Sequence, residues 1–474
     1  MNKSGVVFRF QFAQFKREKG MMAFYCLSVL IIGIIVPLFL RRIESSLTMA
    51  ALLTAMFLKP ILSDSLTGER EHRTLETLLS SPINGKSIIW GKSLFSLCFA
   101  VVFFGLTASF TALVSWLTNN DTVIALWQWT GIIVVAMFIF SAIAIAGVHA
   151  SATSADTRAA NTRVSRIVYP FGLLFTIYLT VVATLDYFPA IIVGLILALI
   201  CLGVIVVYAI KDLKMKQSDY FENLKAKKAV KAQDNYASRN TPKTQFEIVM
   251  RFEVKYLMTL KMLLLNFGVL CVCPLAIVCI TTYYTGIIDL NYAALLTVLA
   301  IPRVPTNLIA YSIGGEKVYK TGESLLSTPL HIRPIFLAKC AIPVLVSAIM
   351  LLTSALLTLM GVNIISWILP DIGGVYKYTA SQLVLIFPVG IMASLMMMFI
   401  SAILSAILKT PRHGLFATSL ISFLFVIPVL AIVYLTQNTL MWSLIYFAFL
   451  VIGNTVCIGN ISDKISRSQI MSWL

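Results

Sequence analysis

The chain has 474 residues, of which 59% are hydrophobic and only 12% are charged, and its formal net charge is +17. Because about a quarter of the residues of a soluble domain are charged, this composition excludes a soluble globular protein and indicates a polytopic membrane protein. A positive charge is also typical of nucleic-acid binding. Here, however, the basic residues lie between apolar runs, as they do on the cytosolic side of membrane proteins, and this favours a membrane protein without a nucleic-acid partner.

The first 40 residues combine a basic, aromatic segment with an apolar run. Residues 1–20 place five basic side chains among valines and phenylalanines, which is the pattern of an amphipathic helix lying on the inner leaflet. Residues 21–40 form an apolar run that is long for a signal peptide, and Arg41 and Arg42 stand where a small-residue cleavage site would be needed. We therefore expect residues 21–40 to form the first span.

Further apolar runs are long enough to cross a bilayer core of about 30 Å. They fall near residues 46–63, 93–116, 123–147, 167–185, 188–210, 262–284, 291–312, 340–360, 381–408, 414–435 and 440–460. Together with the first run they predict an all-α membrane protein of about twelve transmembrane helices, six in each half of the chain.

Basic residues are distributed unevenly over this topology. With the N-terminus inside, the outer loops hold only Arg41, Arg42 and Lys377 of the 37 lysines and arginines. Since basic residues are retained on the cytosolic side, we expect both termini to be cytosolic in a multi-pass protein of a bacterial plasma membrane.

A basic segment joins the two halves. Residues 211–245 hold nine basic residues against four acidic ones, which predicts a cytosolic linker, either a solvated tether or a segment in contact with anionic lipid headgroups. Residues 246–260 then resemble residues 1–20. The expected organisation is a first six-span half over 1–210, the linker over 211–245 and a second six-span half over 246–474. The halves are parallel repeats, because an even number of spans separates them.

A polar loop recurs in the two halves at a spacing of 247 residues. Gly68–Pro82 aligns with Gly315–Pro329, and from Gly68/Gly315 to Lys92/Lys339 ten of twenty-five pairs are identical. Arg70/Lys317 and Arg73/Lys320 also retain their charge. An internal repeat of this kind defines the architecture.

The loop has the pattern of a short amphipathic helix. Leu75, Leu78 and Leu79 fall on one helical face, and Pro82 limits the continuation of the helix. Such a helix suits a groove on a partner protein, whereas the alternative is a helix that packs on lipid headgroups and on its own spans. Two copies at equivalent positions favour two equivalent docking sites.

The string Gly-Glu-Arg-x-x-x-Thr-Leu-Glu-x-Leu-Leu-x-x-Pro after the second span, followed by Gly91 and Lys92 at the third, resembles the permease subunits of type-2 ABC exporters. In that family this loop carries the coupling helix, an elbow helix precedes the first span, and each half has six spans. The resemblance covers nearly all of the chain and implies two permease halves fused in one polypeptide.

The resemblance also implies the residues and partners of the site. The resemblance assigns coupling to the ATPase to two sets of residues at equivalent positions of the repeat. These are Glu69, Arg70, Arg73, Thr74, Glu76, Leu78, Leu79 and Pro82 in the first half, and Glu316, Lys317, Lys320, Thr321, Glu323, Leu325, Leu326 and Pro329 in the second. Two copies of a separate cytosolic ATP-binding subunit would dock there and bind ATP and Mg, and this chain would hold no cofactor. The second copy departs from the pattern at Gly322, which replaces Leu75, so the two docking sites are expected to differ.

The chain contains no energy source of its own. None of its twenty acidic residues is central in a predicted span, which argues against a proton- or sodium-coupled secondary carrier of the major-facilitator type. Gly85-Lys86-Ser87 and Gly91-Lys92-Ser93 are not phosphate loops, because Ser80 and Lys86 occupy the positions at which a further glycine is required. The chain is therefore expected not to be an enzyme.

Cysteines and histidines suggest no metal centre. The eight cysteines fall inside apolar runs, Cys-x-x-Cys is absent, and the chain has only four histidines. We expect the cysteines to be small apolar core residues, with no metal site.

Two basic residues lie within predicted spans. Arg303, between Pro302 and Pro305, is expected either to satisfy carbonyls freed by the prolines or to line the substrate pathway. Lys59 is expected to extend its ammonium group to the inner interface.

The predicted function is that of an ATP-driven ABC permease that exports a hydrophobic or amphipathic substrate, such as a peptide, a lipid-like molecule or a drug. Export follows from the family resemblance, and the apolar spans suggest the substrate class. The alternatives are a secondary carrier and a membrane scaffold or sensor that transports nothing.

Overall fold

The computed structural model describes two compact units, Met1–Ala237 and Ser238–Leu474. The residues that it describes are 3–17, 19–35, 37–38, 43–71, 84–118, 126–154, 157–184, 187–214, 247, 250, 268, 271–272, 274–279, 282, 288, 290–300, 306, 308–309, 312–313, 332–368, 374–407, 421, 425, 427–436 and 438–464. All regular elements among them are helices, which confirms the all-helical prediction for this part of the chain.

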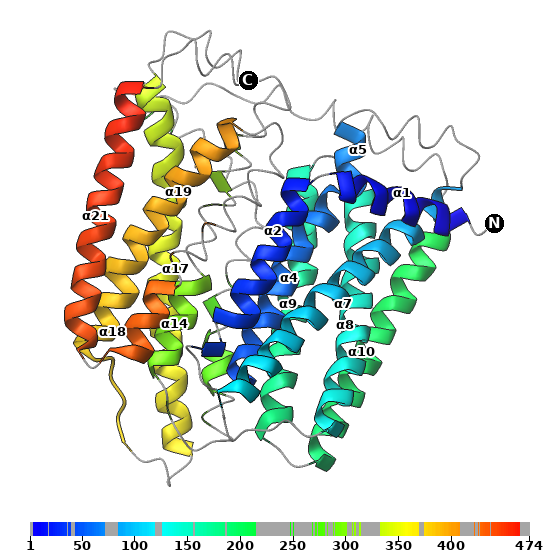
Figure 1. Cartoon of the computed structure of the whole chain (residues 1–474), viewed down its shortest axis with the longest axis horizontal. Coiled ribbons are helices and arrows are strands. Elements are labelled where there is room, and N and C mark those ends of the chain that lie inside the picture. The colour runs from blue at the N-terminus through cyan, green and yellow to red at the C-terminus, as the bar shows by residue number, and fades with distance from the viewer. Residues whose placement is uncertain are drawn as a thin grey trace, which may run out of the picture. The chain divides into compact units, whose positions relative to one another are not determined.

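Unit 1 is a bundle of long helices with a short helix lying across one end. Its elements are α1 (Lys3–Arg17), α2 (Lys19–Leu30), a π-helical turn η1 (Ile31–Ile35), α4 (Ile43–Asp64), α5 (Thr67–Glu71), α7 (Gly85–Leu117), α8 (Leu126–Ala152), α9 (Thr157–Thr184) and α10 (Tyr187–Lys214). Figure 1 shows α1 running across the ends of the long helices, with α5 at the same end of the unit.

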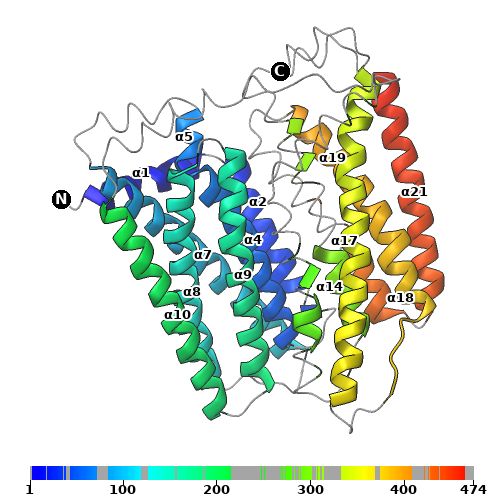
Figure 2. The ribbon, with the colours of Figure 1, turned by 180° about the vertical axis from the view of Figure 1, so that it is seen from behind.

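Small residues let the helices of unit 1 approach closely. A Cβ atom added at Gly147 of α8 would lie 2.7 Å from the Leu62 side chain of α4, and one added at Gly172 of α9 would lie 3.2 Å from Ala55 of α4. Such contacts are typical of membrane helices, which gain little hydrophobic free energy by leaving lipid and associate through close packing. They place α4 at the centre of the unit, in contact with α7, α8 and α9 (Figure 2).

Unit 2 also consists of helices in its described residues. These are α14 (Leu290–Ala300), α17 (Ile332–Ile368), α18 (Ala380–Val384), a π-helical turn η3 (Leu385–Val389), α19 (Gly390–Ile407) and α21 (Thr439–Lys464). α19 packs against α17 and α21. Its inner face joins Met398, Phe399 and Ala402 to Ile309 and to Cys340 of α17 in one buried cluster.

Six helices of the described residues are long and apolar enough to cross a membrane, where about twelve were expected. They cover Gly85–Leu117, Trp127–Ala152, Pro189–Asp212, Leu337–Ile368, Ala380–Ser405 and Thr439–Gly459. In unit 1, α4 and α9 also coincide with the expected spans near 46–63 and 167–185. In unit 2, much of the expected runs 262–284, 291–312 and 414–435 lies outside the described residues.

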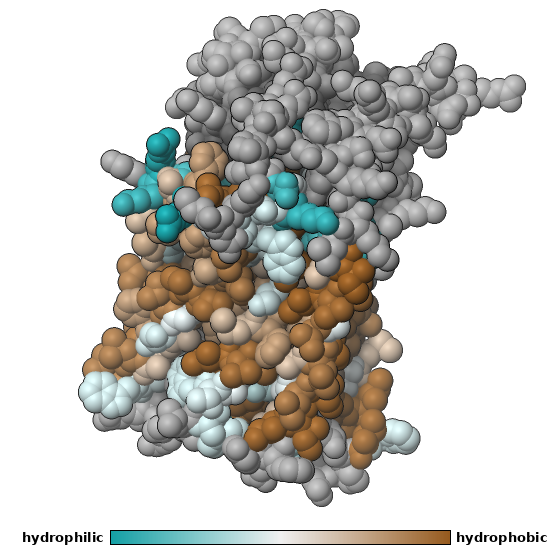
Figure 3. Space-filling view, turned by 90° about the vertical axis from the view of Figure 1, so that its right-hand side faces the viewer, coloured by the Kyte–Doolittle hydropathy of each residue, from teal (hydrophilic) through white to brown (hydrophobic). Residues whose placement is uncertain are grey.

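Apolar side chains cover the outer surface of the long helices. On α10 the exposed residues include Leu195, Leu199 and Val206, whose exposed fractions are 60%, 66% and 48%. The space-filling view shows a broad band of apolar side chains on this face, with polar side chains along its upper border (Figure 3). A continuous exposed apolar surface of this kind is what a bilayer covers, and the chain is a multi-pass membrane protein.

Candidate functional site

The described residues contain the base of the first repeated loop. Of the predicted site residues, Glu69 and Arg70 lie there, on α5. The others lie outside the described residues, and these are Arg73, Thr74, Glu76, Leu78, Leu79, Pro82, Arg303, Glu316, Lys317, Lys320, Thr321, Glu323, Leu325, Leu326 and Pro329. The structure therefore tests how the loop begins.

The first turn of α5 is fixed by a serine of another helix. The backbone N–H groups of Leu66 and Thr67 donate to Ser151 Oγ at 3.1 and 3.2 Å, and Ser151 Oγ donates to the Ser63 carbonyl at 3.1 Å. The first N–H groups of a helix have no partner within the helix. Ser151, near the end of α8, supplies one here, although 84 residues separate it from Thr67.

Glu69 connects α5 to α7 and α1. Its carboxylate accepts a hydrogen bond from Lys92 Nζ of α7 at 2.5 Å and a longer one from Gln11 Nε2 of α1 at 3.4 Å. Lys92 Nζ also donates to the Ser65 carbonyl. The Lys92 and Glu69 side chains are 3% and 18% exposed, so this pair is largely removed from water.

Arg70 reaches in another direction, toward the end of α8. Its Nη2 donates to the Ala152 carbonyl at 2.8 Å, and its Nη1 donates to the Ser154 carbonyl. Arg163 of α9 donates to the intervening Thr153 carbonyl at 2.8 Å. Two arginines thus bind three successive carbonyls where α8 ends, a place at which carbonyls lack helical partners and cations are favoured.

Adjacent residues therefore tie the base of the loop to different elements. Glu69 binds α7 and α1, and Arg70 binds the turn between α8 and α9. We call this set of contacts the loop anchor, made by Glu69, Arg70, Lys92, Gln11 and the carbonyls of residues 65, 152 and 154. A displacement of the loop would act on all these elements, because each contact ends on buried or half-buried polar atoms.

Unit 2 has a related contact at the equivalent place. Lys339 Nζ donates to Ser312 Oγ at 3.0 Å, and both side chains are buried. Lys339 and Ser312 are the repeat mates of Lys92 and Ser65 at the spacing of 247 residues. In both units a lysine at the start of a long helix therefore binds the serine three residues before the repeated loop. Lys92 binds the carbonyl of Ser65, and Lys339 binds the hydroxyl of Ser312.

Sequence reasoning missed several members of the anchor. Lys92 and Lys339 are identical in the two copies, and that identity was the available signal, but neither was assigned a role. Ser151, which binds the start of α5, and the carbonyls of Ala152 and Ser154 come from the end of α8 and the residues after it, whose sequence gives no sign of a partner.

Gly91, in the second Gly-Lys-Ser string, has a packing role. A Cβ atom there would lie 2.7 Å from the Ser4 carbonyl oxygen and 2.7 Å from Val7 Cβ, so glycine lets α1 lie directly against α7. The aromatic side chains of α1 continue this contact, and Phe15 lies edge-on to Phe95 and Phe99 of α7.

Two other polar contacts lie outside the anchor. Lys59, expected to extend to the interface, is instead 7% exposed and donates to Tyr169 Oη of α9 at 3.2 Å. Asp212, counted among the acids of the linker, lies in the last turn of α10, where it is 1% exposed and hydrogen-bonded to His149 Nδ1 of α8. Among the described residues, no three His, Cys, Asp or Glu side chains gather as a metal site would require.

Comparison with known proteins places this architecture in a family. The profile described as ABC-2 family transporter protein matches residues 10–192 and, a second time, residues 188–448. The two matches together span most of both units. No curated protein matches the chain.

The first match contains every residue of the loop anchor. Permeases of this family are transmembrane subunits without an ATPase domain, and they work with ATP-binding subunits. The chain belongs to the ABC-2 transporter family, as a membrane permease component.

Proposed function

We propose that this chain is the permease of an ATP-driven exporter in which two fused halves of six spans each bind one copy of a cytosolic ATP-binding subunit. The loops over residues 69–82 and 316–329 form the two docking sites, ATP and Mg are held by the partners, and both termini lie in the cytosol of a bacterial cell. The double match of one family profile and the repeated loop support this arrangement.

The loop anchor is the observation that carries the proposal. A docking loop can drive transport only if its movement reaches the spans. Glu69 and Arg70 supply that connection, because they bind α7 and the turn between α8 and α9 through short, largely buried polar contacts, and Glu69 also accepts a longer hydrogen bond from α1. Closure of the ATP-bound partners would move the loops, and the attached helices would shift as packed units between inward- and outward-facing states.

The substrate class remains the hydrophobic or amphipathic one. Apolar spans with few charges favour a peptide, a lipid-like molecule or a drug. Arg303 belongs to this proposal as a group that would meet an anionic part of the substrate. Membership of the ABC-2 family leaves no support for a secondary carrier, so a scaffold or sensor that uses the same loops is the competing function.

The deciding experiment measures ATP turnover by the chain and its co-purified ATPase in proteoliposomes. Candidate hydrophobic peptides, amphiphiles and dyes are added, and ATPase rate and cargo accumulation are followed together. We expect at least one cargo to raise both rates. Turnover that no cargo changes, with no vesicle accumulation, would favour the scaffold.

Variants of the anchor test the coupling route. Glu69→Gln and Arg70→Gln are expected to lower cargo-stimulated turnover while the ATPase still co-purifies, because the docking surface beyond residue 71 is retained. Lys86→Gln is the matched control. Lys86 is exposed at the start of α7, so this substitution removes a cation close to the anchor without breaking an anchor contact. If Lys86→Gln and the anchor variants reduce stimulation equally, the route through Glu69 and Arg70 is wrong.

A further inference from the structure

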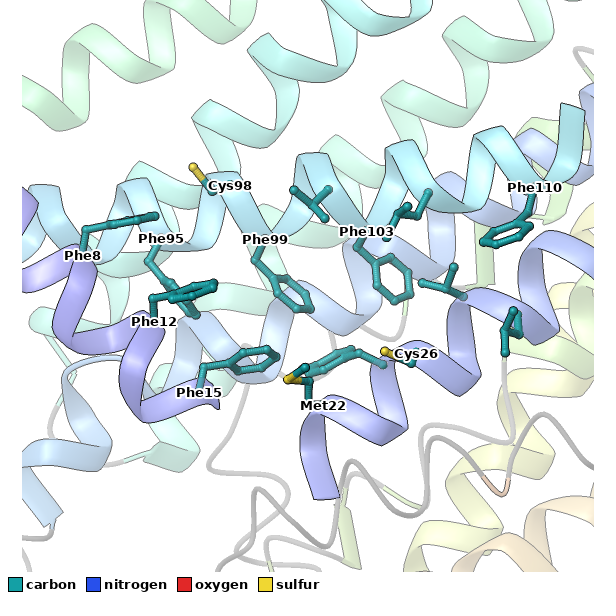
Figure 4. Close-up of a pocket in the computed structure, with 15 residues that line it drawn as sticks. Phe8, Phe12, Phe15, Met22, Cys26, Phe95, Cys98, Phe99, Phe103 and Phe110 are labelled. Atoms are coloured by element: carbon teal, nitrogen blue, oxygen red, sulfur yellow. The ribbon is translucent and has the colours of Figure 1, made fainter. Parts of the chain in front are cut away.

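An apolar groove lies between α1, α2 and α7. It encloses about 400 Å³ and is lined by fifteen side chains, none of them charged. Aromatic rings dominate its wall, with Phe8, Phe12 and Phe15 from α1 facing rings of α7 (Figure 4). The polar atoms among the lining side chains are the hydroxyl of the buried Tyr25 and the thiols of Cys26 and Cys98, and the rest of the wall is hydrocarbon, so the ligand that fits the groove itself is a hydrocarbon.

The groove is elongated along α7. Its wall runs from Phe95, beside α1, to Phe110 (Figure 4). Fifteen residues of helix correspond to about 22 Å, and one leaflet of the hydrocarbon core is about 15 Å thick. The groove therefore begins where α1 lies and is long enough to hold a lipid acyl chain through one leaflet.

The rim of the groove is open and apolar. Val102 and Leu106 of α7 are 60% and 48% exposed, and Met22 of α2 is 44% exposed. An acyl chain in the groove would cover these side chains along its length.

Exposed cations stand at the end of the groove that α1 forms. Arg9 and Lys16 of α1 are exposed, and they lie three residues before and four residues after Phe12, so they share its helical face. Residues 1–17 contain no acidic side chain. The carboxylate that Gln11 contacts, on Glu69, is bound by Lys92. The charge at this end is therefore positive beside an apolar wall.

We propose that this groove binds an anionic phospholipid of the surrounding membrane, with one acyl chain against the aromatic wall and the phosphate at Arg9 and Lys16. Each cation near a membrane surface increases binding of an anionic lipid by about fivefold. A headgroup of no net charge gains nothing from the cations. The site therefore selects by headgroup charge, whereas ordinary solvation of an apolar helix does not.

Photo-crosslinking of lipids to the purified full-length chain tests the proposal. The chain is reconstituted in phosphatidylcholine vesicles with a trace of either phosphatidylglycerol or phosphatidylcholine, each carrying the same diazirine acyl chain. Adducts are mapped by peptide mass spectrometry. We expect adducts on residues 8–15 and 95–110, with a preference for phosphatidylglycerol of about fivefold or more.

Two pairs of variants separate the headgroup site from the groove. Arg9→Gln with Lys16→Gln is expected to abolish the preference, whereas Lys211→Gln, which removes an exposed cation at the end of α10, is expected to keep it. Val102→Trp narrows the open rim and is expected to lower groove adducts from both lipids. Leu195→Trp, at an equally exposed apolar position on α10, is its control.

The outcomes are distinct. Equal labelling of the groove by both probes in the unaltered protein would overturn the proposal in favour of ordinary lipid solvation. Absence of adducts from the groove, with adducts on α10, would also overturn it and would indicate that another part of the protein covers the groove. A preference that survives Arg9→Gln with Lys16→Gln would overturn the assigned phosphate site. None of these results depends on transport activity.

Discussion

The ion pair between Glu69 and Lys92 allows a quantitative test of the loop anchor. Lys92→Met removes the ammonium group that pairs with the Glu69 carboxylate. Removing one partner of a buried pair costs about 3–5 kcal/mol, and the 18% exposure of Glu69 places the expected loss at the lower end, at about 3 kcal/mol. Glu69→Gln leaves the Lys92 ammonium, which is 3% exposed, without its counter-charge, and because the glutamine carbonyl can still accept a hydrogen bond from it, the expected loss is again about 3 kcal/mol.

The double variant carries the information about coupling. Once one charge is gone, removing the other no longer strands a buried group. The double variant should therefore be about 2 kcal/mol more stable than the sum of the single losses. Helicity is followed during equilibrium unfolding in mixed micelles with increasing dodecyl sulfate, and Lys86→Met is the exposed control, with an expected change within about 0.5 kcal/mol.

Additive single losses would refute this reasoning. Agreement of the double variant with the sum to within about 0.5 kcal/mol would show that the two groups do not stabilise each other. The 247-residue repeat pairs Glu316 with Glu69 and Lys339 with Lys92, so the same cycle on Glu316→Gln and Lys339→Met is expected to give coupling of the same sign.

Three further predictions follow from individual positions. Gly91→Ala is expected to destabilise the fold by about 1–3 kcal/mol, because the added methyl group meets α1, whereas Gly105→Ala on the same helix, with nothing within 4 Å, should stabilise it by up to about 1 kcal/mol; equal effects in unfolding titrations would contradict the packing argument. Arg70→Lys should show cargo-stimulated ATP turnover between those of the unaltered chain and Arg70→Gln, because lysine retains the charge but loses the forked geometry of the guanidinium group. Equal turnover of Arg70→Lys and Arg70→Gln would show that the charge has no role. Arg303→Ala is expected to abolish transport while the ATPase still co-purifies, and cargo accumulation at the unaltered rate would remove Arg303 from the pathway.

The parts of the fold that follow from local pattern were predictable. The apolar runs of the first half coincide with helices, because the length and hydropathy of a run are properties of the segment itself. Lys59 shows the limit of that reasoning: a lysine near a span end was expected at the interface, but Tyr169, 110 residues away, offers it a partner inside the bundle. Asp212 was counted in the expected cytosolic linker over 211–245, whereas α10 extends to Lys214 and places Asp212 against His149.

Only part of the loop anchor was predictable. The repeat identified Glu69 and Arg70, since retention in two copies is visible in the sequence. Their partners depend on how α8 ends and where α9 begins, and backbone carbonyls such as those of Ala152 and Ser154 have no sequence signature at all. Lys92 is identical in both copies, but its sequence context is that of any basic residue at the cytosolic end of a span. A buried ammonium group and an exposed one cannot be told apart before the helices are packed.

The position of the anchor at the base of the loop has a consequence for engineering. The anchor contacts begin at Glu69 and Arg70, directly before the segment 72–83, which lies outside the described residues. Under the proposed function, we expect that this segment can be exchanged for the corresponding stretch of another ABC-2 permease while Glu69, Arg70 and Lys92 keep the contacts described here. If the loop docks as proposed, such chimaeras are expected to co-purify with the ATP-binding subunit of the permease that donates the segment.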